Sequence, residues 1–170
     1  QNYTLSRKYF ELSAKQNDAK GIHNFENHFF NGIDINPSFF NTREYFELTN
    51  TPIDSEALFN MGYHYFTGRN LMKAKFYFEL SAQQNNPMAL LFLGNFYFHG
   101  WFVPRDYQKA IDYYSLSIEN GNSTAQVYLG NMYRNGLGVE QDYIKAKEYY
   151  ESAAQKDDPE AFLYLGQIYE

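Results

Sequence analysis

The segment YFELSA occupies residues 9–14 and returns unchanged at residues 77–82. Related segments stand between and after these copies: YFELTN at 45–50, YYSLSI at 113–118 and YYESAA at 149–154. Their first tyrosines are separated by 36, 32, 36 and 36 positions. Self-similarity at a fixed period of about 20–50 residues is typical of stacked repeats, in which each unit buries its apolar face against its neighbours. The sequence therefore predicts a repeat protein.

A second set of residues keeps the same spacing and predicts the first helix of each unit. Small residues recur in phase at Gly21, Ala57, Ala89, Ala125 and Ala161. Each begins a stretch in which apolar residues follow helical spacing; Ala125, Leu129 and Tyr133 stand at i, i+4 and i+8. Three positions before each small residue stands an Asx residue, the side-chain acceptor of a helix N-cap: Asp18, Asp54, Asn86, Asn122 and Asp158.

The YFELSA copies predict a second helix in each unit, preceded by the cap residues Asn70, Asp106 and Asp142. We therefore expect an all-α solenoid of antiparallel helix pairs. It would comprise a half-unit at 1–17, units at about 18–53, 54–85, 86–121 and 122–157, and a half-unit at 158–170. Because neither end carries the polar cap that solenoids need, we expect the chain to be an excerpt of a longer array.

The connection between the two helices explains the single shorter period. Seven steps separate Gly100 from Tyr107, whereas three separate Gly68 from Leu71. Four residues are therefore missing from an exposed loop, where deletions are tolerated. Within the first helices, glycine stands at one equivalent position: Gly62, Gly94, Gly130 and Gly166. A glycine inside a helix costs about 1 kcal/mol relative to alanine, so we expect the two helices to approach closely there.

Composition argues against several function classes. A net charge of −6 and a pI near 5.2 leave no basic stripe for nucleic acid, and they disfavour an acidic partner. No apolar run reaches the roughly 20 residues that membrane insertion requires. The absence of cysteine excludes disulfides and thiol chemistry. No catalytic or metal-ligand motif is present, so we expect no enzymatic activity, cofactor or metal. The four histidines are scattered along the chain: His23, His28, His64 and His99.

The unit from Ala125 to Ala154 resembles a Sel1-like repeat, a relative of the tetratricopeptide repeat. The residues that carry this resemblance are Leu129-Gly130, Tyr133, GLGV at 136–139, Asp142, Lys145-Ala146 and Tyr149-Tyr150. The unit from Ala89 matches as well, although WFVP at 101–104 stands where GxGV is usual. The unit from Ala57 has lost this loop, and the unit from Gly21 diverges most.

The resemblance implies a right-handed superhelix whose concave face is lined by the first helices. The position after the glycine site is a candidate for partner binding, and it reads Asn27, Tyr63, Asn95, Asn131 and Gln167. A ladder of amides suits the backbone of an extended peptide. The alternative is that exposed asparagine is simply common in this chain. Neighbouring candidates face either the groove or the core between units: Phe59, Phe66, Leu91, Phe98 and Arg134.

These features favour a non-enzymatic scaffold or adaptor that holds a partner protein or extended peptide along the concave face. The alternative is a structural subunit embedded in a larger assembly, such as an endoplasmic-reticulum degradation adaptor complex. The lack of cysteine favours the cytoplasm over the endoplasmic-reticulum lumen.

Overall fold

The computed structural model describes residues 8–9, 12–13, 16 and 54–169. Residues 54–169 form helices α4 (Ser55–Thr67), α5 (Leu71–Ala82), α6 (Pro87–His99), α7 (Tyr107–Glu119), α8 (Ser123–Asn135), α9 (Tyr143–Ala154) and α10 (Pro159–Tyr169). No strand occurs in this part of the chain, which confirms the predicted all-α class. The unit predicted at 18–53, with Asn27, lies outside the described residues, as does most of the half-unit at 1–17.

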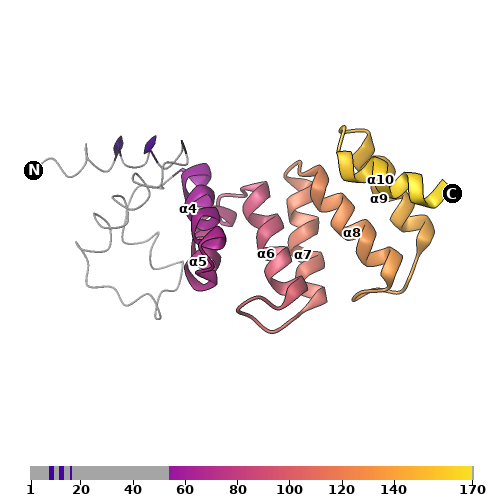
Figure 1. Ribbon diagram of the computed structural model, residues 1–170, viewed down its shortest axis with the longest axis horizontal. Coiled ribbons are helices and arrows are strands. Elements are labelled where there is room, and N and C mark those ends of the chain that lie inside the picture. The colour runs from indigo at the N-terminus through magenta and orange to yellow at the C-terminus, as the bar shows by residue number, and fades with distance from the viewer. Residues whose placement is uncertain (1–7, 10–11, 14–15, 17–53, 170) are drawn as a thin grey trace, which may run out of the picture. The chain divides into compact units, whose positions relative to one another are not determined.

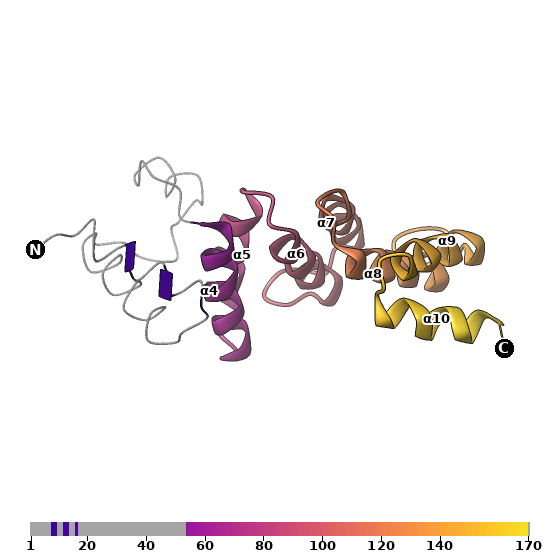
Figure 2. The same cartoon turned by 90° about the horizontal axis from the view of Figure 1, so that it is seen from above.

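The chain divides into two compact units, Gln1–Asn86 and Pro87–Glu170. In the first, α4 packs on α5. In the second, α6 packs on α7 and α8 on α9, while α7 contacts α8 and α9 contacts α10 (Figures 1 and 2). Within residues 54–169, each first helix except α10 therefore packs on the second helix that follows it, and α10 contacts α9 of the preceding pair. The helix pairs predicted in this part of the chain are confirmed.

Six of the predicted caps begin their helices as expected, while Asp18 lies outside the described residues. The Asp54 carboxylate accepts hydrogen bonds from the backbone N–H groups of Glu56 and Ala57 at 3.0 and 3.3 Å. Five other caps accept from the backbone in the same way: Asn70, Asp106, Asn122, Asp142 and Asp158. These acceptors satisfy N–H groups that would otherwise lack a partner within the helix.

Two caps of the second unit also join successive helix pairs. The Asn122 side-chain amide donates to the Pro87 carbonyl at 3.3 Å. The Asp158 carboxylate, which is buried, accepts from the hydroxyls of Ser123 and Thr124 at 3.2 and 3.0 Å. A cap at the start of one first helix thereby fixes the start of the preceding one.

The glycines allow the predicted close approach in three helix pairs. A Cβ atom on Gly62 would lie 2.6 Å from the Phe78 ring, and one on Gly130 would lie 2.7 Å from the Tyr150 ring. Gly94 faces the Tyr114 ring in the same way. Gly166 differs, because a Cβ atom there would meet nothing within 4 Å.

Candidate functional site

The asparagines that follow two of these glycines form hydrogen bonds inside their own helix pairs. The Tyr114 hydroxyl donates to Asn95 Oδ1 at 2.7 Å, and the Tyr150 hydroxyl donates to Asn131 Oδ1 at 2.7 Å. Both tyrosines are fully buried, and a buried hydroxyl without a partner is costly. The carbonyl oxygen of each amide therefore serves the fold.

In the first unit, both members of this asparagine–tyrosine pair are replaced, and the second-helix residue has no hydroxyl. Tyr63 follows Gly62 where the other pairs have asparagine, and Phe78 occupies the position of the buried tyrosine. Phenylalanine has no hydroxyl, so it needs no acceptor on the first helix. The two positions change together within this one chain, a signal present in the sequence that our reading of the amides missed.

The Asn95 amide also joins neighbouring helix pairs. Burial raises the pKa of Tyr128 on α8, and the neighbouring Asn95 side chain lowers that pKa in part. The Tyr128 ring lies 5.5 Å from the Tyr114 ring. Asn95 is itself buried at 8% exposure. Its amide therefore packs between α6 and α8 and is not displayed to a partner.

Polar side chains connect α8 and α10 at the surface. Arg134 Nη1 donates to Gln167 Oε1 at 3.2 Å, and the guanidinium lies 5.2 Å from the centre of the Tyr164 ring. Burial raises the pKa of Tyr150 to about 12, although the charge of Arg134 lowers it. Arg134 forms no ion pair with any residue that the structure describes. We name Arg134 and Gln167 the polar bridge.

The apolar candidates lie largely in the packed interior. Leu91 is buried in the core beside Ala110 and Leu129, and Phe98 packs against this cluster. Phe59 and Phe66 are half-buried beside the Phe78 ring, at centroid distances of 5.7 and 6.5 Å. Leu91 is therefore inaccessible to a partner.

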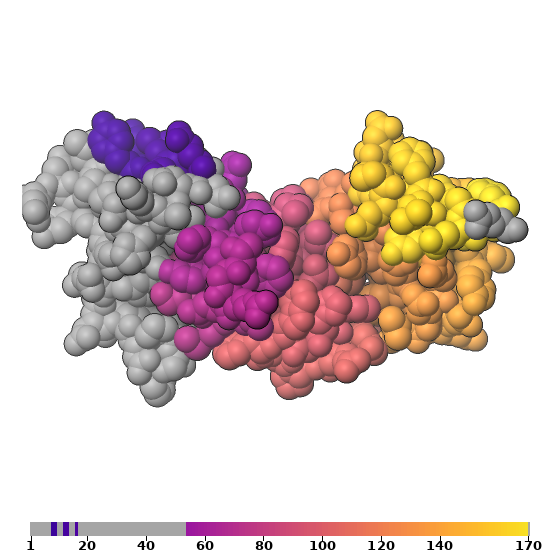
Figure 3. Space-filling view, viewed as in Figure 1, coloured from indigo at the N-terminus to yellow at the C-terminus, as the bar shows by residue number. Residues whose placement is uncertain are grey.

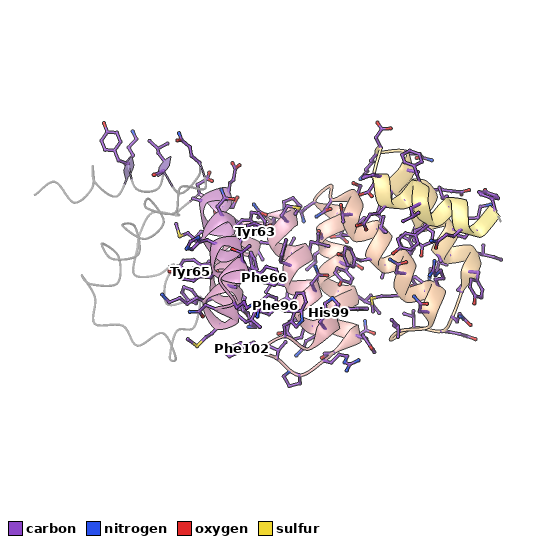
Figure 4. All side chains as sticks on the ribbon, viewed as in Figure 1. Tyr63, Tyr65, Phe66, Phe96, His99 and Phe102 are labelled. Carbon is purple, nitrogen blue, oxygen red and sulfur yellow. The ribbon has the colours of Figure 1, made fainter. Side chains whose placement is uncertain are left out.

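Among the candidates that the structure describes, the accessible ones are mainly polar. Gln167 is exposed, Arg134 and Asn131 are half-buried, and Tyr63 is exposed at 39%. Tyr63 lies on α4 in the first unit (Figure 4). The other three lie on α8 and α10 in the second.

A repeated tyrosine–tyrosine–lysine stack joins the two helices of each pair, and the sequence analysis did not identify it. A first-helix tyrosine stacks on a second-helix tyrosine at centroid distances of 5.6–5.7 Å, and a lysine covers the first ring at 4.5–5.1 Å. The three sets are Tyr65, Tyr77 and Lys73; Tyr97, Tyr113 and Lys109; and Tyr133, Tyr149 and Lys145. Cation–π contacts of this kind stabilise a fold modestly.

The described residues contain no group of three or more His, Asp or Glu side chains that could hold a metal ion. Within the same residues, no helix is both long and apolar enough to span a bilayer. His64 and His99 contact aromatic rings at 5.5 and 4.4 Å. His99 is exposed, and partial burial of its ring lowers its pKa, which the nearby Arg105 lowers further.

The sequence matches the family model described as Sel1 repeat at residues 1–18, 55–86, 87–122 and 123–158. A search of curated proteins found no match. Among solved structures, a Sel1 repeat protein from Oxalobacter formigenes is 34% identical, with a TM-score of 0.63; the match covers 76% of this chain and 56% of that one.

Two other solved structures share the fold at lower identity. The protective antigen c5321 of uropathogenic Escherichia coli, which displays an SLR fold, is 22% identical with a TM-score of 0.60. The match covers 96% of this chain and 44% of that one. Helicobacter pylori cysteine rich protein B is 18% identical with a TM-score of 0.50, covering 94% and 92%.

This chain thus spans about half the length of the Oxalobacter and Escherichia proteins. Sel1 repeat proteins generally mediate protein–protein interactions and are generally scaffolds without enzymatic activity. The matched repeats, the paired helices and the structural neighbours agree that the chain belongs to the Sel1 repeat family.

Proposed function

We propose that the chain is a non-enzymatic adaptor that holds a partner protein or an extended peptide along the side lined by its first helices. The polar bridge is the observation that carries this proposal. It joins α8 to α10 through a hydrogen bond of 3.2 Å and leaves Gln167 exposed. A partner lying across these helices would meet donors and acceptors from both of them.

The ladder of amides predicted from the sequence contributes less to this proposal than expected, because two of its members form hydrogen bonds within the fold. The oxygens of Asn95 and Asn131 already accept from buried tyrosines. Removing these amides would weaken the fold as well as any binding, so they are poor probes of function. The polar bridge tests binding more cleanly, because its residues are not buried.

Affinity capture tests the proposal. The full chain is the bait in a lysate of its native organism, and mass spectrometry quantifies the proteins that it retains. We expect Arg134→Ala combined with Gln167→Ala to lower recovery of a specific partner about tenfold, as loss of a moderate interface contribution predicts. Glu148→Ala, at an exposed position on α9, is the matched control and should leave recovery unchanged. Equal recovery by wild type and the double variant, with both folded, contradicts this binding face.

The exposed apolar residues of α10 favour a second candidate, a structural subunit buried in a larger assembly. Phe162, Leu163 and Tyr169 are exposed at 54%, 60% and 69%. The α10 atoms lie on the visible surface in Figure 3. Large exposed apolar patches are typical of interfaces with other proteins.

The two candidates differ in whether bound proteins exchange. An adaptor exchanges its partner, so isotope-labelled partner added to the purified complex should replace the bound copy. A structural subunit should retain its neighbours, and Phe162→Ser with Leu163→Ser should then release it from the assembly. If the partner exchanges rapidly and this variant stays in the assembly, the structural-subunit candidate is refuted and the adaptor remains.

A further inference from the structure

The loop between α6 and α7 has a phenylalanine at the position where the equivalent loop between α8 and α9 has a glycine. Gly136 and Gly138, after α8, have positive φ angles of 64° and 72°. The positions 36 residues earlier are Gly100 and Phe102, with φ angles of 74° and 57°. The two loops therefore share their backbone conformation, although only one has glycine at both positions.

This conformation strains Phe102. The left-handed region favours glycine, and a bulky side chain there is an outlier. Strain of this kind persists when burial of the side chain compensates for it, or when function requires it. The Phe102 side chain is exposed at 59%, so burial within the chain provides little compensation.

The backbone beside Phe102 is held firmly. The Trp101 N–H donates to the Phe96 carbonyl at 2.9 Å, and the Trp101 ring stacks on His99 at 4.4 Å. Phe96 meets the same indole edge-on at 5.9 Å. Figure 4 labels Phe96, His99 and Phe102 at this end of α6. An exposed aromatic side chain on an ordered loop loses little conformational entropy on binding.

We propose that Phe102 is a binding anchor that inserts its ring into an apolar pocket of a partner protein. Arg105 is also exposed in this loop and donates to the Tyr107 hydroxyl at 3.1 Å. It adds a positive charge to the loop that carries Phe102, so the partner should have an acidic residue at the edge of the pocket. The inference rests on the proposed function, because it requires that the chain binds a protein. Aromatic anchors of this kind dominate many interfaces.

Thermal unfolding of the chain alone separates this role from a structural one. Phe102→Gly releases the backbone strain, so the melting temperature should rise by about 2–6 °C. Phe102→Ala is the matched control, because it removes the ring but keeps a side chain at positive φ. Its melting temperature should stay within about 1 °C of wild type. A clear fall for both variants would overturn the proposal, since the ring would then support the fold.

Binding is tested by photo-crosslinking with p-benzoylphenylalanine in place of Phe102, followed by purification of the crosslinked protein. Trp101, the only tryptophan in the chain, then reports titration with this partner by fluorescence, provided that the partner's own signal is subtracted. We expect Phe102→Gly and Phe102→Ala each to weaken binding at least about tenfold. Unchanged affinity overturns the proposal.

Two further arms distinguish the alternatives. If the polar-bridge variant weakens binding and Phe102→Ala does not, the anchor is refuted while the proposed function stands. If Phe102→Ala alone weakens binding, the anchor stands and the proposed face is refuted. Vesicles of phosphatidylcholine and phosphatidylserine should leave Trp101 emission unchanged. A blue shift that Phe102→Ala abolishes would overturn the proposal, because the ring would then insert into lipid.

Discussion

Adding one methyl group at two equivalent glycines should change stability in opposite directions. Gly130→Ala places a Cβ atom 2.7 Å from the Tyr150 ring and 3.2 Å from the Ala146 carbonyl oxygen. Gly166→Ala places the same atom in open space, with nothing within 4 Å. The two substitutions are chemically identical, so the comparison isolates the close helix approach.

The expected magnitudes follow from two opposing effects. Alanine is better than glycine inside a helix by about 1 kcal/mol, whereas overpacking a filled interface costs about 1–3 kcal/mol. Gly130→Ala should therefore reduce the free energy of unfolding by up to about 2 kcal/mol. Gly166→Ala should increase it by up to about 1 kcal/mol, because only the propensity term applies.

Urea unfolding followed by circular dichroism measures both changes, and the slopes should agree among variants. A double-mutant cycle with Tyr150→Ala assigns the cost to the ring, since Gly130→Ala should cost little once the ring is absent. If Gly130→Ala stabilises the chain as much as Gly166→Ala does, the close packing of α8 on α9 is refuted.

Three other predictions concern hydrogen-bonding and titratable side chains. Asn131→Ala should destabilise the chain by about 1–3 kcal/mol in chemical unfolding, because the Tyr150 hydroxyl loses its acceptor, and Tyr150→Phe should remove most of that cost. Phe78→Tyr should be destabilising in the same assay, because α4 has no asparagine after its glycine; unchanged stability would show that the hydroxyl finds another acceptor. Because the pKa of His99 is lower in the folded chain, the unfolded chain binds more protons as the pH falls. The contribution of His99 to stability is therefore lost as the pH falls below about 6.5. Trp101 fluorescence should titrate with a midpoint below that value, and a midpoint at or above it would contradict the assignment.

The helices and their starts could be predicted from the sequence because their causes are local. An N-cap such as Asp54 needs only its own side chain and the next few backbone N–H groups. Apolar periodicity likewise depends on residues within one helix. Recurrence of both at the same spacing predicted the helix pairs, and the family assignment agrees.

The use of each side chain within a pair was less predictable. Asn95 and Asn131 have the polarity of surface residues, yet their oxygens accept from tyrosines on the second helix. Those tyrosines are 19 residues further along the chain, a separation that helical periodicity within one segment does not address. The matched change to Tyr63 and Phe78 was the available signal.

The sequence by itself determined the repeat, the helix pairs and the loop lengths, since these depend on short-range capping and periodicity. Only the tertiary structure decided which polar groups are consumed in packing and which remain at the surface. It also showed that Phe102 adopts a glycine conformation while its ring stays exposed. The physical reason is that burial and hydrogen-bond pairing depend on neighbouring helices, whose side chains meet only after the chain has folded.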